Sequence, residues 1–321
     1  MATEERTALF ETGETGTSLW AQSVRRLLRK KVGMACLAVI LVFYVAGATA
    51  QWIAPYDYNA FDIEEIKGRP SLGHPFGTDR AGRDIFTRVI YGLRTLVILT
   101  VAAMATGFVL LGITLGLISG YFGKLADAVI MRVGEVFLSF PDILLVLLIA
   151  ATVKPRVTEW VFAFEDATGI EGIVSLGIVD YVVIFGAMSA FSWVGMARLV
   201  RGQVLYIKES QYVEAAQATG ASTLRVLATH VLPNVLSPVI VVVSMGMGGL
   251  VFTAVVLGWL GIGVQPPTPD LGRMLFENGN IGVLRSDPHL LLFPVGVITV
   301  LIFGFNLLGD ALNDAFNPRA R

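Results

Sequence analysis

Side chains that could carry out chemistry are scattered in this sequence. The three histidines, His74, His230 and His289, stand far apart, and neither an H-E-x-x-H pair nor a cysteine cluster accompanies them, so we expect no metal site. The chain has no G-x-x-x-x-G-K-[ST] run to hold nucleotide phosphates and no G-x-S-x-G turn to present a nucleophile. We therefore expect the chain not to be an enzyme by itself.

Three charged residues, Arg132, Glu135 and Asp142, lie beside or within a long apolar run. A charge at membrane depth is costly unless it is paired or wetted. The spacing of Arg132 and Glu135 predicts an ion pair on one helix face. Asp142 follows Pro141, and two hypotheses stay open for it: it lines a polar path through the membrane, or it caps a helix that is broken at the proline.

The elements that must position these residues are membrane helices. Of the 321 residues, 55% are hydrophobic and 15% charged, and the mean hydropathy of +0.70 is too high for a soluble domain. Six segments are long and apolar enough to span a bilayer, namely residues 32–54, 96–119, 136–153, 181–200, 235–260 and 290–308. The sequence therefore predicts an all-α membrane protein with six transmembrane helices. No basic surface suited to nucleic acid is present.

Two further patterns concern packing and orientation. Gly112, Gly116 and Gly120 recur every four residues, which predicts close approach of another helix. Within residues 1–31, apolar and basic side chains after Trp20 fall on opposite helix faces, which predicts an interfacial helix against lipid headgroups. Basic residues are more frequent in the segments that are cytoplasmic if the N-terminus is inside, so both termini are expected in the cytoplasm.

The longest predicted cytoplasmic connection covers residues 201–233. Ser210 is expected to cap a first short helix, and Gly220 to end it. A second helical stretch is expected from Ser222, with Pro233 as its end. Glu214 and Arg225 are placed so that they could pair at the rim of an exposed surface.

This connection carries a family motif, which is Glu214-Ala215-Ala216, three residues, Gly220, nine residues and then His230-Val231-Leu232-Pro233. It resembles the EAA loop of ABC importer permeases, whose coupling helix docks on a cytoplasmic ATPase. The resemblance implies that the loop couples to the ATPase through the following residues: Glu214, Ala215, Ala216, Gly220, Arg225, Leu232 and Pro233. His230 stands where the general pattern favours an apolar residue, as is common in the dipeptide and oligopeptide branch.

A second resemblance lies in the predicted extracytoplasmic segment, residues 55–93. Its motif residues are Gly77, Thr78, Asp79, Gly82, Arg83 and Asp84, and the run is similar to the C-type subunit of peptide/nickel permeases. Two hypotheses stay open for it. The charges satisfy one another in a brace, with Asp84 paired to Arg88, or the segment contacts a binding protein or a partner subunit. The likeness covers nearly the whole chain, except the first thirty or so residues and a loop expected over residues 154–172.

The resemblance implies a type I ABC importer permease fold, with a core over residues 94–310 and a cytoplasmic tail over 311–321. The implied partners are a homologous second permease, two P-loop ATPase subunits that bind ATP and Mg, and an extracytoplasmic solute-binding protein, in a bacterial or archaeal inner membrane. Short peptides are the expected solute. Nickel chelates, glutathione or another small solute, or a secondary transporter without ATPase partners, are the alternatives.

Overall fold

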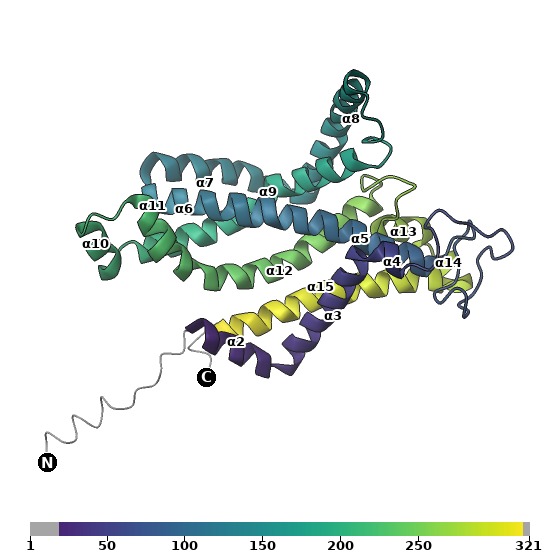
Figure 1. The fold of residues 1–321 in the computed structure, drawn as a ribbon, viewed down its shortest axis with the longest axis horizontal. Coiled ribbons are helices and arrows are strands. Elements are labelled where there is room, and N and C mark those ends of the chain that lie inside the picture. Colours follow the sequence, from purple (N-terminus) through teal and green to yellow (C-terminus); the bar gives the residue numbers. More distant parts are fainter. Residues whose placement is uncertain (1–18, 317–321) are drawn as a thin grey trace, which may run out of the picture.

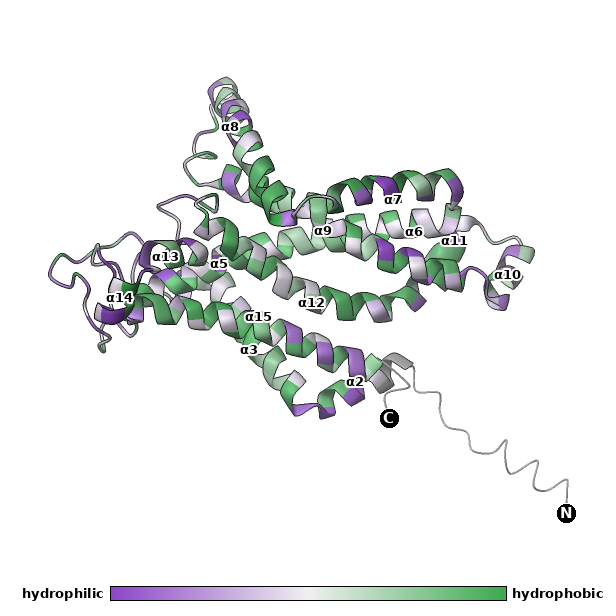
Figure 2. Cartoon of the chain, turned by 180° about the vertical axis from the view of Figure 1, so that it is seen from behind, coloured by the Kyte–Doolittle hydropathy of each residue, from purple (hydrophilic) through white to green (hydrophobic). Residues whose placement is uncertain are grey.

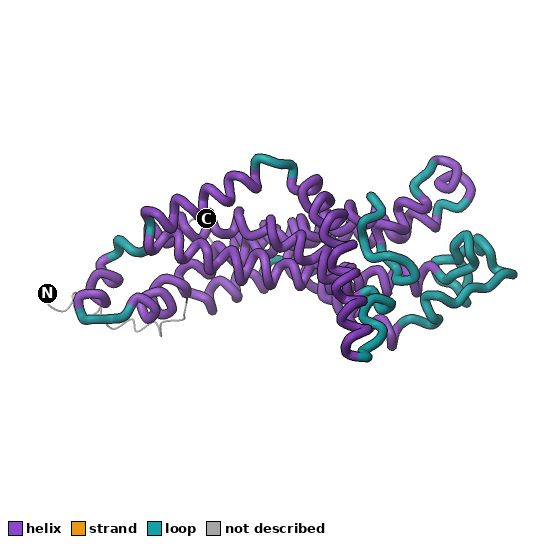
Figure 3. The backbone as a smooth tube through the Cα atoms, turned by 90° about the horizontal axis from the view of Figure 1, so that it is seen from above, coloured by secondary structure: helices purple, strands orange, loops and turns teal. Residues whose placement is uncertain are grey.

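The computed structural model describes residues 19–316, with side chains described from residue 23 onward. Over this range the chain consists of helices joined by loops (Figure 3). The only β pairing among the described residues is a single bridge between Thr78 and Asp84. In chain order the helices, with π-helical segments labelled η, are α2 (Leu19–Arg29), α3 (Lys31–Ala48), α4 (Ala50–Ile53), α5 (Ile85–Ala103), η1 (Met104–Ile113), α6 (Thr114–Phe122), α7 (Lys124–Leu138), α8 (Asp142–Thr168), α9 (Ile178–Ile207), α10 (Gln211–Ala218), α11 (Thr223–Val226), η2 (Leu227–Val231), α12 (Leu232–Trp259), α13 (Leu271–Asn278), α14 (Ile281–Ser286) and α15 (His289–Phe316).

The predicted all-α membrane fold is confirmed. Five continuous helical stretches are long and apolar enough to cross a bilayer, and a bent pair, α7 with α8, brings the number to six if it forms one span. The long helices carry their apolar residues along the middle of the bundle, while hydrophilic residues gather around α10 at one end and α13 and α14 at the other (Figure 2). This division is what a bilayer around the middle of the bundle requires.

The third predicted span, residues 136–153, has wrong bounds. The chain bends by 89° between α7 and α8, so the predicted segment includes the end of one helix and the start of another. Pro141 has no N–H to continue α7, which explains why the break lies there. The expected loop over residues 154–172 is also wrong as far as Thr168, because α8 continues to that residue and points away from the bundle (Figure 1).

The predicted close approach of the glycine face is confirmed. A Cβ atom on Gly112 would lie 2.6 Å from Cβ of Met196, one on Gly116 would lie 2.6 Å from Cβ of Val200, and one on Gly120 would lie 2.7 Å from Cβ of Val204. The three partners on α9 follow the same spacing as the glycines. Helices η1 and α6 therefore pack against α9 at a distance that larger side chains would prevent.

The N-terminal helix forms where the amphipathic pattern predicts one, as α2. At this end of the bundle Lys30 pairs with Asp314 near the end of α15. Residues 1–18 of the predicted N-terminal segment lie outside the described residues, and an interfacial position for α2 stays a prediction. The helix α15 runs to Phe316, so the segment expected as a tail from residue 311 begins as helix.

Candidate functional site

A cavity of about 380 Å³ opens where α7 bends into α8. Its lining comes from η1, α7, α8, α9 and α12 and is mostly aromatic or aliphatic, with Phe108, Phe137 and Phe191 among the walls. Asp142, Ser192 and Thr253 are the polar side chains that reach it. Such a cavity can hold an apolar side chain of a solute while a few polar groups orient the rest.

Asp142 lies at the start of α8, where its carboxylate accepts a 2.8 Å hydrogen bond from the backbone N–H of Ile143. Its side chain stays exposed at the cavity, so both functions considered for it from the sequence fit its position. The bend between α7 and α8 is what brings this carboxylate to the cavity. A straight third span would have placed it on the side of a continuous helix.

The segment from Glu214 to Pro233, called the EAA segment below, lies at the end of the bundle opposite α13 and α14 (Figure 1). The short helix α10 is held by Val213, which is fully buried against a cluster that includes Val204 on α9 and Val235 on α12. Around this anchor, Glu214 and Ala215 are exposed, while Ala216 is half-buried. The segment is therefore fixed to the two long helices that line the cavity and leaves its outer face open.

Gly220 ends α10 in the left-handed region, with φ of +84°. The N–H of Gly220 donates to the carbonyl of Gln217 at 2.9 Å, and the N–H of Ala221 donates to that of Ala216 at 3.0 Å. These bonds satisfy carbonyl groups that the end of the helix leaves open. The expected helix end at Gly220 is confirmed.

Ser210 is the N-cap residue of α10, as expected, but its hydroxyl donates to the carbonyl of Ile207 at 2.6 Å and accepts no N–H of the helix. Two other expectations for this segment are wrong. Glu214 and Arg225 form no ion pair in the described part of the chain. Pro233 does not end the second helical stretch, since α11, η2 and α12 are continuous and form one candidate span, Thr223–Trp259. The wide π turns of η2 directly precede Pro233, where the proline ring would clash with a tighter helix.

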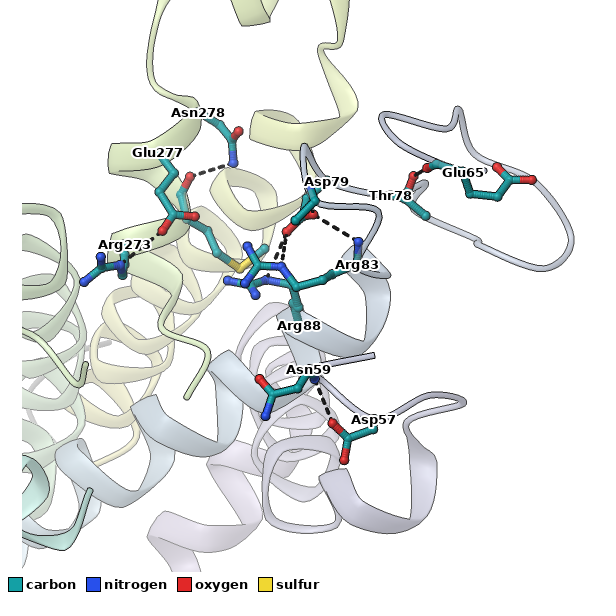
Figure 4. Close-up of polar contacts among 12 residues, drawn as sticks. Asp57, Asn59, Glu65, Thr78, Asp79, Arg83, Arg88, Arg273, Glu277 and Asn278 are labelled. Carbon is teal, nitrogen blue, oxygen red and sulfur yellow. Dashed lines mark hydrogen bonds and ion pairs between the residues drawn. The ribbon is translucent and has the colours of Figure 1, made fainter. Parts of the chain in front are cut away.

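At the opposite end, the motif around Asp79 forms a compact charged turn (Figure 4). Asp79 accepts backbone N–H bonds from Ala81 and Arg83 at 2.8 and 3.0 Å, and Nε of Arg83 donates to it at 2.7 Å. Nε of Arg88 lies 3.7 Å from the same carboxylate. Gly77 and Gly82 have positive φ angles, and Thr78 donates its hydroxyl to the carbonyl of Glu65.

The expected pair between Asp84 and Arg88 is wrong. Asp84 caps α5 by accepting the N–H of Thr87 at 2.7 Å, and its other oxygen lies 2.9 Å from Nδ1 of His74. Arg88 turns to Asp79 instead. As an N-cap, Asp84 directs its carboxylate to the free N–H groups of the first helical turn, and not to the side chain four positions later. Asp79 and Asp84 thus each have a basic partner, but Nη1 of Arg88 is buried without a hydrogen-bond partner, so the brace and the contact with another protein both stay open for this segment.

A further set of contacts, which the sequence does not predict, closes the bundle beside α8. Nζ of Lys154 lies 2.7 Å from Oδ1 of Asp180 on α9, and Oδ2 of Asp180 accepts the N–H of Gln265 at 2.8 Å. The side chain of Gln265 in turn accepts a 3.3 Å bond from Arg273 on α13. No local spacing in the sequence signals this connection, because its members come from distant segments.

Comparison with known proteins decides the family. The family described as binding-protein-dependent transport system inner membrane component matches residues 112–321. The chain belongs to this family. Residues 18–70 match a second family, described as the N-terminal TM domain of oligopeptide transport permease C.

Two relatives illustrate how far the likeness to this permease family extends. The glutathione transport system permease protein of Pectobacterium atrosepticum is 36% identical over 307 residues, which are 94% of this chain and 92% of the relative. The dipeptide transport system permease protein of Alkalihalophilus pseudofirmus is 34% identical over 307 residues, with 96% and 92% coverage. The expected membership of the peptide permease branch is thereby confirmed.

In this permease, the predicted site residues form three separate groups. The EAA segment lies at one end, the turn around Asp79 lies at the other, and Asp142 lies at the cavity between them. Helices α9 and α12 connect the first group to the cavity, because Val213 of α10 belongs to the same buried cluster as Val204 on α9 and Val235 on α12, and both long helices supply cavity walls. The arrangement suits a protein in which movement at one end alters a cavity inside the membrane.

Proposed function

We propose that this chain forms half of the path for short peptides in an ATP-driven importer and that α10 is its contact with a cytoplasmic ATPase. The observation that supports this most is the anchoring of α10. Its exposed face can receive force, and its buried Val213 belongs to one apolar cluster with residues of α9 and α12, the helices that line the cavity. A partner that favours one position of α10 would favour one shape of the cavity.

The other half of the path is assigned to a homologous second permease subunit. A single cavity of about 380 Å³, open on one side of a bent helix, does not enclose a channel. A second subunit facing it would complete the walls, and a pair of ATPase subunits would then contact the two α10 surfaces. An extracytoplasmic binding protein would deliver the solute at the end that carries the Asp79 turn.

The solute assignment rests on the relatives and on the cavity. The relatives are named for dipeptide and glutathione transport, and both solutes contain peptide bonds. The apolar walls with few polar groups accept varied side chains, which suits peptides of different sequence. Glutathione is the second candidate, and the same cavity suits it.

Affinity purification of the chain in mild detergent, followed by mass spectrometry, tests the assembly. We expect recovery of a second permease and of P-loop ATPases at the α10 end. The test variant V213D places a charge at the buried anchor and should no longer recover the ATPases. The control variant E135Q, away from α10, should still recover them. Recovery of the wild-type chain alone, from a preparation that still transports, would exclude the ATP-driven mechanism.

A further inference from the structure

A second, charged hollow lies on the α10 side of the apolar cavity. It has a volume of about 610 Å³ and is lined by Asp127, Ala128, Met131, Arg132, Glu135, Arg198 and Arg201. The apolar cavity uses the next residues of the same helices, Phe137 on α7 and Met188, Phe191 and Ser192 on α9. The two hollows therefore follow each other along one face, formed by α7 and α9.

Part of the charge in this hollow is fixed in place. Nη2 of Arg201 donates to Oδ2 of Asp127 at 2.6 Å, and the hydroxyl of Ser119 donates to the same carboxylate at 2.5 Å. With 34% and 22% of their side chains exposed, Arg201 and Asp127 are partly shielded. These bonds hold α7 to α9 and occupy the Asp127 carboxylate and one edge of the Arg201 guanidinium.

The remaining charges are available. Nη1 of Arg132 lies 3.0 Å from Glu135, but 81% and 51% of these side chains are exposed, so the pair is weak and can exchange partners. Arg198 is exposed and forms no ion pair with any residue between 19 and 316. Its guanidinium is thus the unpaired cation of the hollow.

We propose that this hollow is a carboxylate-binding part of the solute path and that Arg198 binds a free carboxylate of the passing solute. The inference rests on the proposed function. A peptide that leaves the apolar cavity carries a terminal carboxylate, whose desolvation is costly unless it meets a cation. A guanidinium can offer two parallel N–H donors to it. Glu135, once separated from Arg132, can accept a bond from the ammonium end.

The test compares wild type, R198Q, R198K and R156Q in complete transporters reconstituted in liposomes. Arg156 is an exposed cation on α8, away from the hollow, and controls for loss of one charge. The probes are radiolabelled dialanine, trialanine and glutathione. Each probe is also tested as its C-terminal amide, which lacks the terminal carboxylate, provided that wild type takes the amide up. The same binding protein serves every variant, so the ratio of variant to wild-type uptake reports on this chain.

We expect R198Q to lower uptake of the free-acid probes roughly tenfold, the value of one charge-assisted hydrogen bond. R198K should retain most uptake, R156Q should match wild type, and amide uptake should not change. Recovery of the second permease with R198Q should also be unchanged. The inference is overturned if R198Q takes up the free acids as well as wild type does, or if uptake of acids and amides falls equally. It is also overturned if R198Q no longer recovers the second permease, which would assign Arg198 to the subunit interface. If wild type takes up none of the probes, the proposed peptide function fails instead.

Discussion

Asp127 on α7 and Arg201 on α9 form a two-point ion pair, in which Nε and Nη2 of the guanidinium donate to the two carboxylate oxygens. The residues are 74 positions apart in the sequence. The pair fixes the start of α7, ahead of the bend that forms the cavity, against a helix that also lines it. Paired geometry of this kind restricts both side chains more than a single contact does.

Asp127→Asn should destabilise the protein, because it leaves the partly shielded Arg201 without a counter-charge. The expected loss is about 1–2 kcal/mol, at the low end for hydrogen bonds to charged groups because the pair is partly exposed. Thermal unfolding in detergent measures it as a lower melting temperature. Glu135→Gln is the matched control: its pair with Arg132 is exposed, so its loss should stay below about 0.5 kcal/mol. Equal effects of the two variants would contradict the structural role of the Asp127 pair.

Gly116→Ala should loosen the contact between α6 and α9. The added Cβ would lie 2.6 Å from Cβ of Val200 and 2.7 Å from the carbonyl of Ala197, so the helices must separate. Overpacking of this kind costs about 1–3 kcal/mol. Gly195→Ala on α9 is the control, because no atom lies within 4 Å of its added Cβ. The melting temperatures of the two variants are compared, and the prediction is wrong if Gly116→Ala is as stable as Gly195→Ala.

Gly220→Val should uncouple ATP hydrolysis from transport while the chain still inserts in the membrane. Its φ of +84° is strained for any β-branched residue, although the space around it is open. The end of α10 would shift and misplace the exposed face. Peptide uptake and ATPase activity of the complete transporter are measured together. Asparagine tolerates this conformation better, so Gly220→Asn should retain more uptake. Normal uptake by the valine variant would contradict the prediction.

Gly249→Phe should block transport without unfolding the protein. Gly249 lines the cavity of about 380 Å³, and no atom lies within 4 Å of a Cβ added there, so a phenyl ring can enter the cavity. Gly296→Phe on α15 is the control, since its position is equally open and lies outside the cavity lining. Uptake in liposomes should be lost only with the first variant. If both variants transport like wild type, the cavity is not on the solute path.

Asp270 should make stability depend on pH. This residue lies between α12 and α13, outside the candidate spans, where burial raises its pKa to about 6 even though backbone N–H groups of Arg273 and Gly272 donate to it. The unfolded carboxyl has the ordinary aspartate pKa of 3.8, so between pH 3.8 and about 6 the folded state binds the extra proton. Its contribution therefore favours folding at low pH and is lost as the pH rises through 6, by about 2–3 kcal/mol in all.

Asp270→Asn isolates this contribution from that of other titrating groups. Asparagine can still accept the N–H of Arg273 as an N-cap, and it has no charge to bury. The melting temperature of the variant minus that of wild type, measured from pH 4 to pH 7, should rise with pH. A difference that stays constant over this range would show that Asp270 has an ordinary pKa in the folded protein.

Several features follow from the sequence alone, because each depends on local spacing. The lengths of the apolar runs predict the number of spans, and the spacing of Gly112, Gly116 and Gly120 predicts a close helix contact. The spacing from Glu214 to Pro233 indicates the family, and Gly220 correctly marks a helix end. Each of these features lies within a short stretch of chain, where backbone geometry fixes which side chains share a face.

Only the tertiary structure decides which charged groups meet and where the cavity lies. Asp84 has Arg88 one turn away, yet it caps its own helix and contacts His74, and Asp127 finds Arg201 on a distant helix. The proline at residue 141 indicates a break, but not the 89° bend that turns Asp142 to the cavity. Such contacts depend on how long helices pack, and the energy of that packing is spread over many residues far apart in the chain.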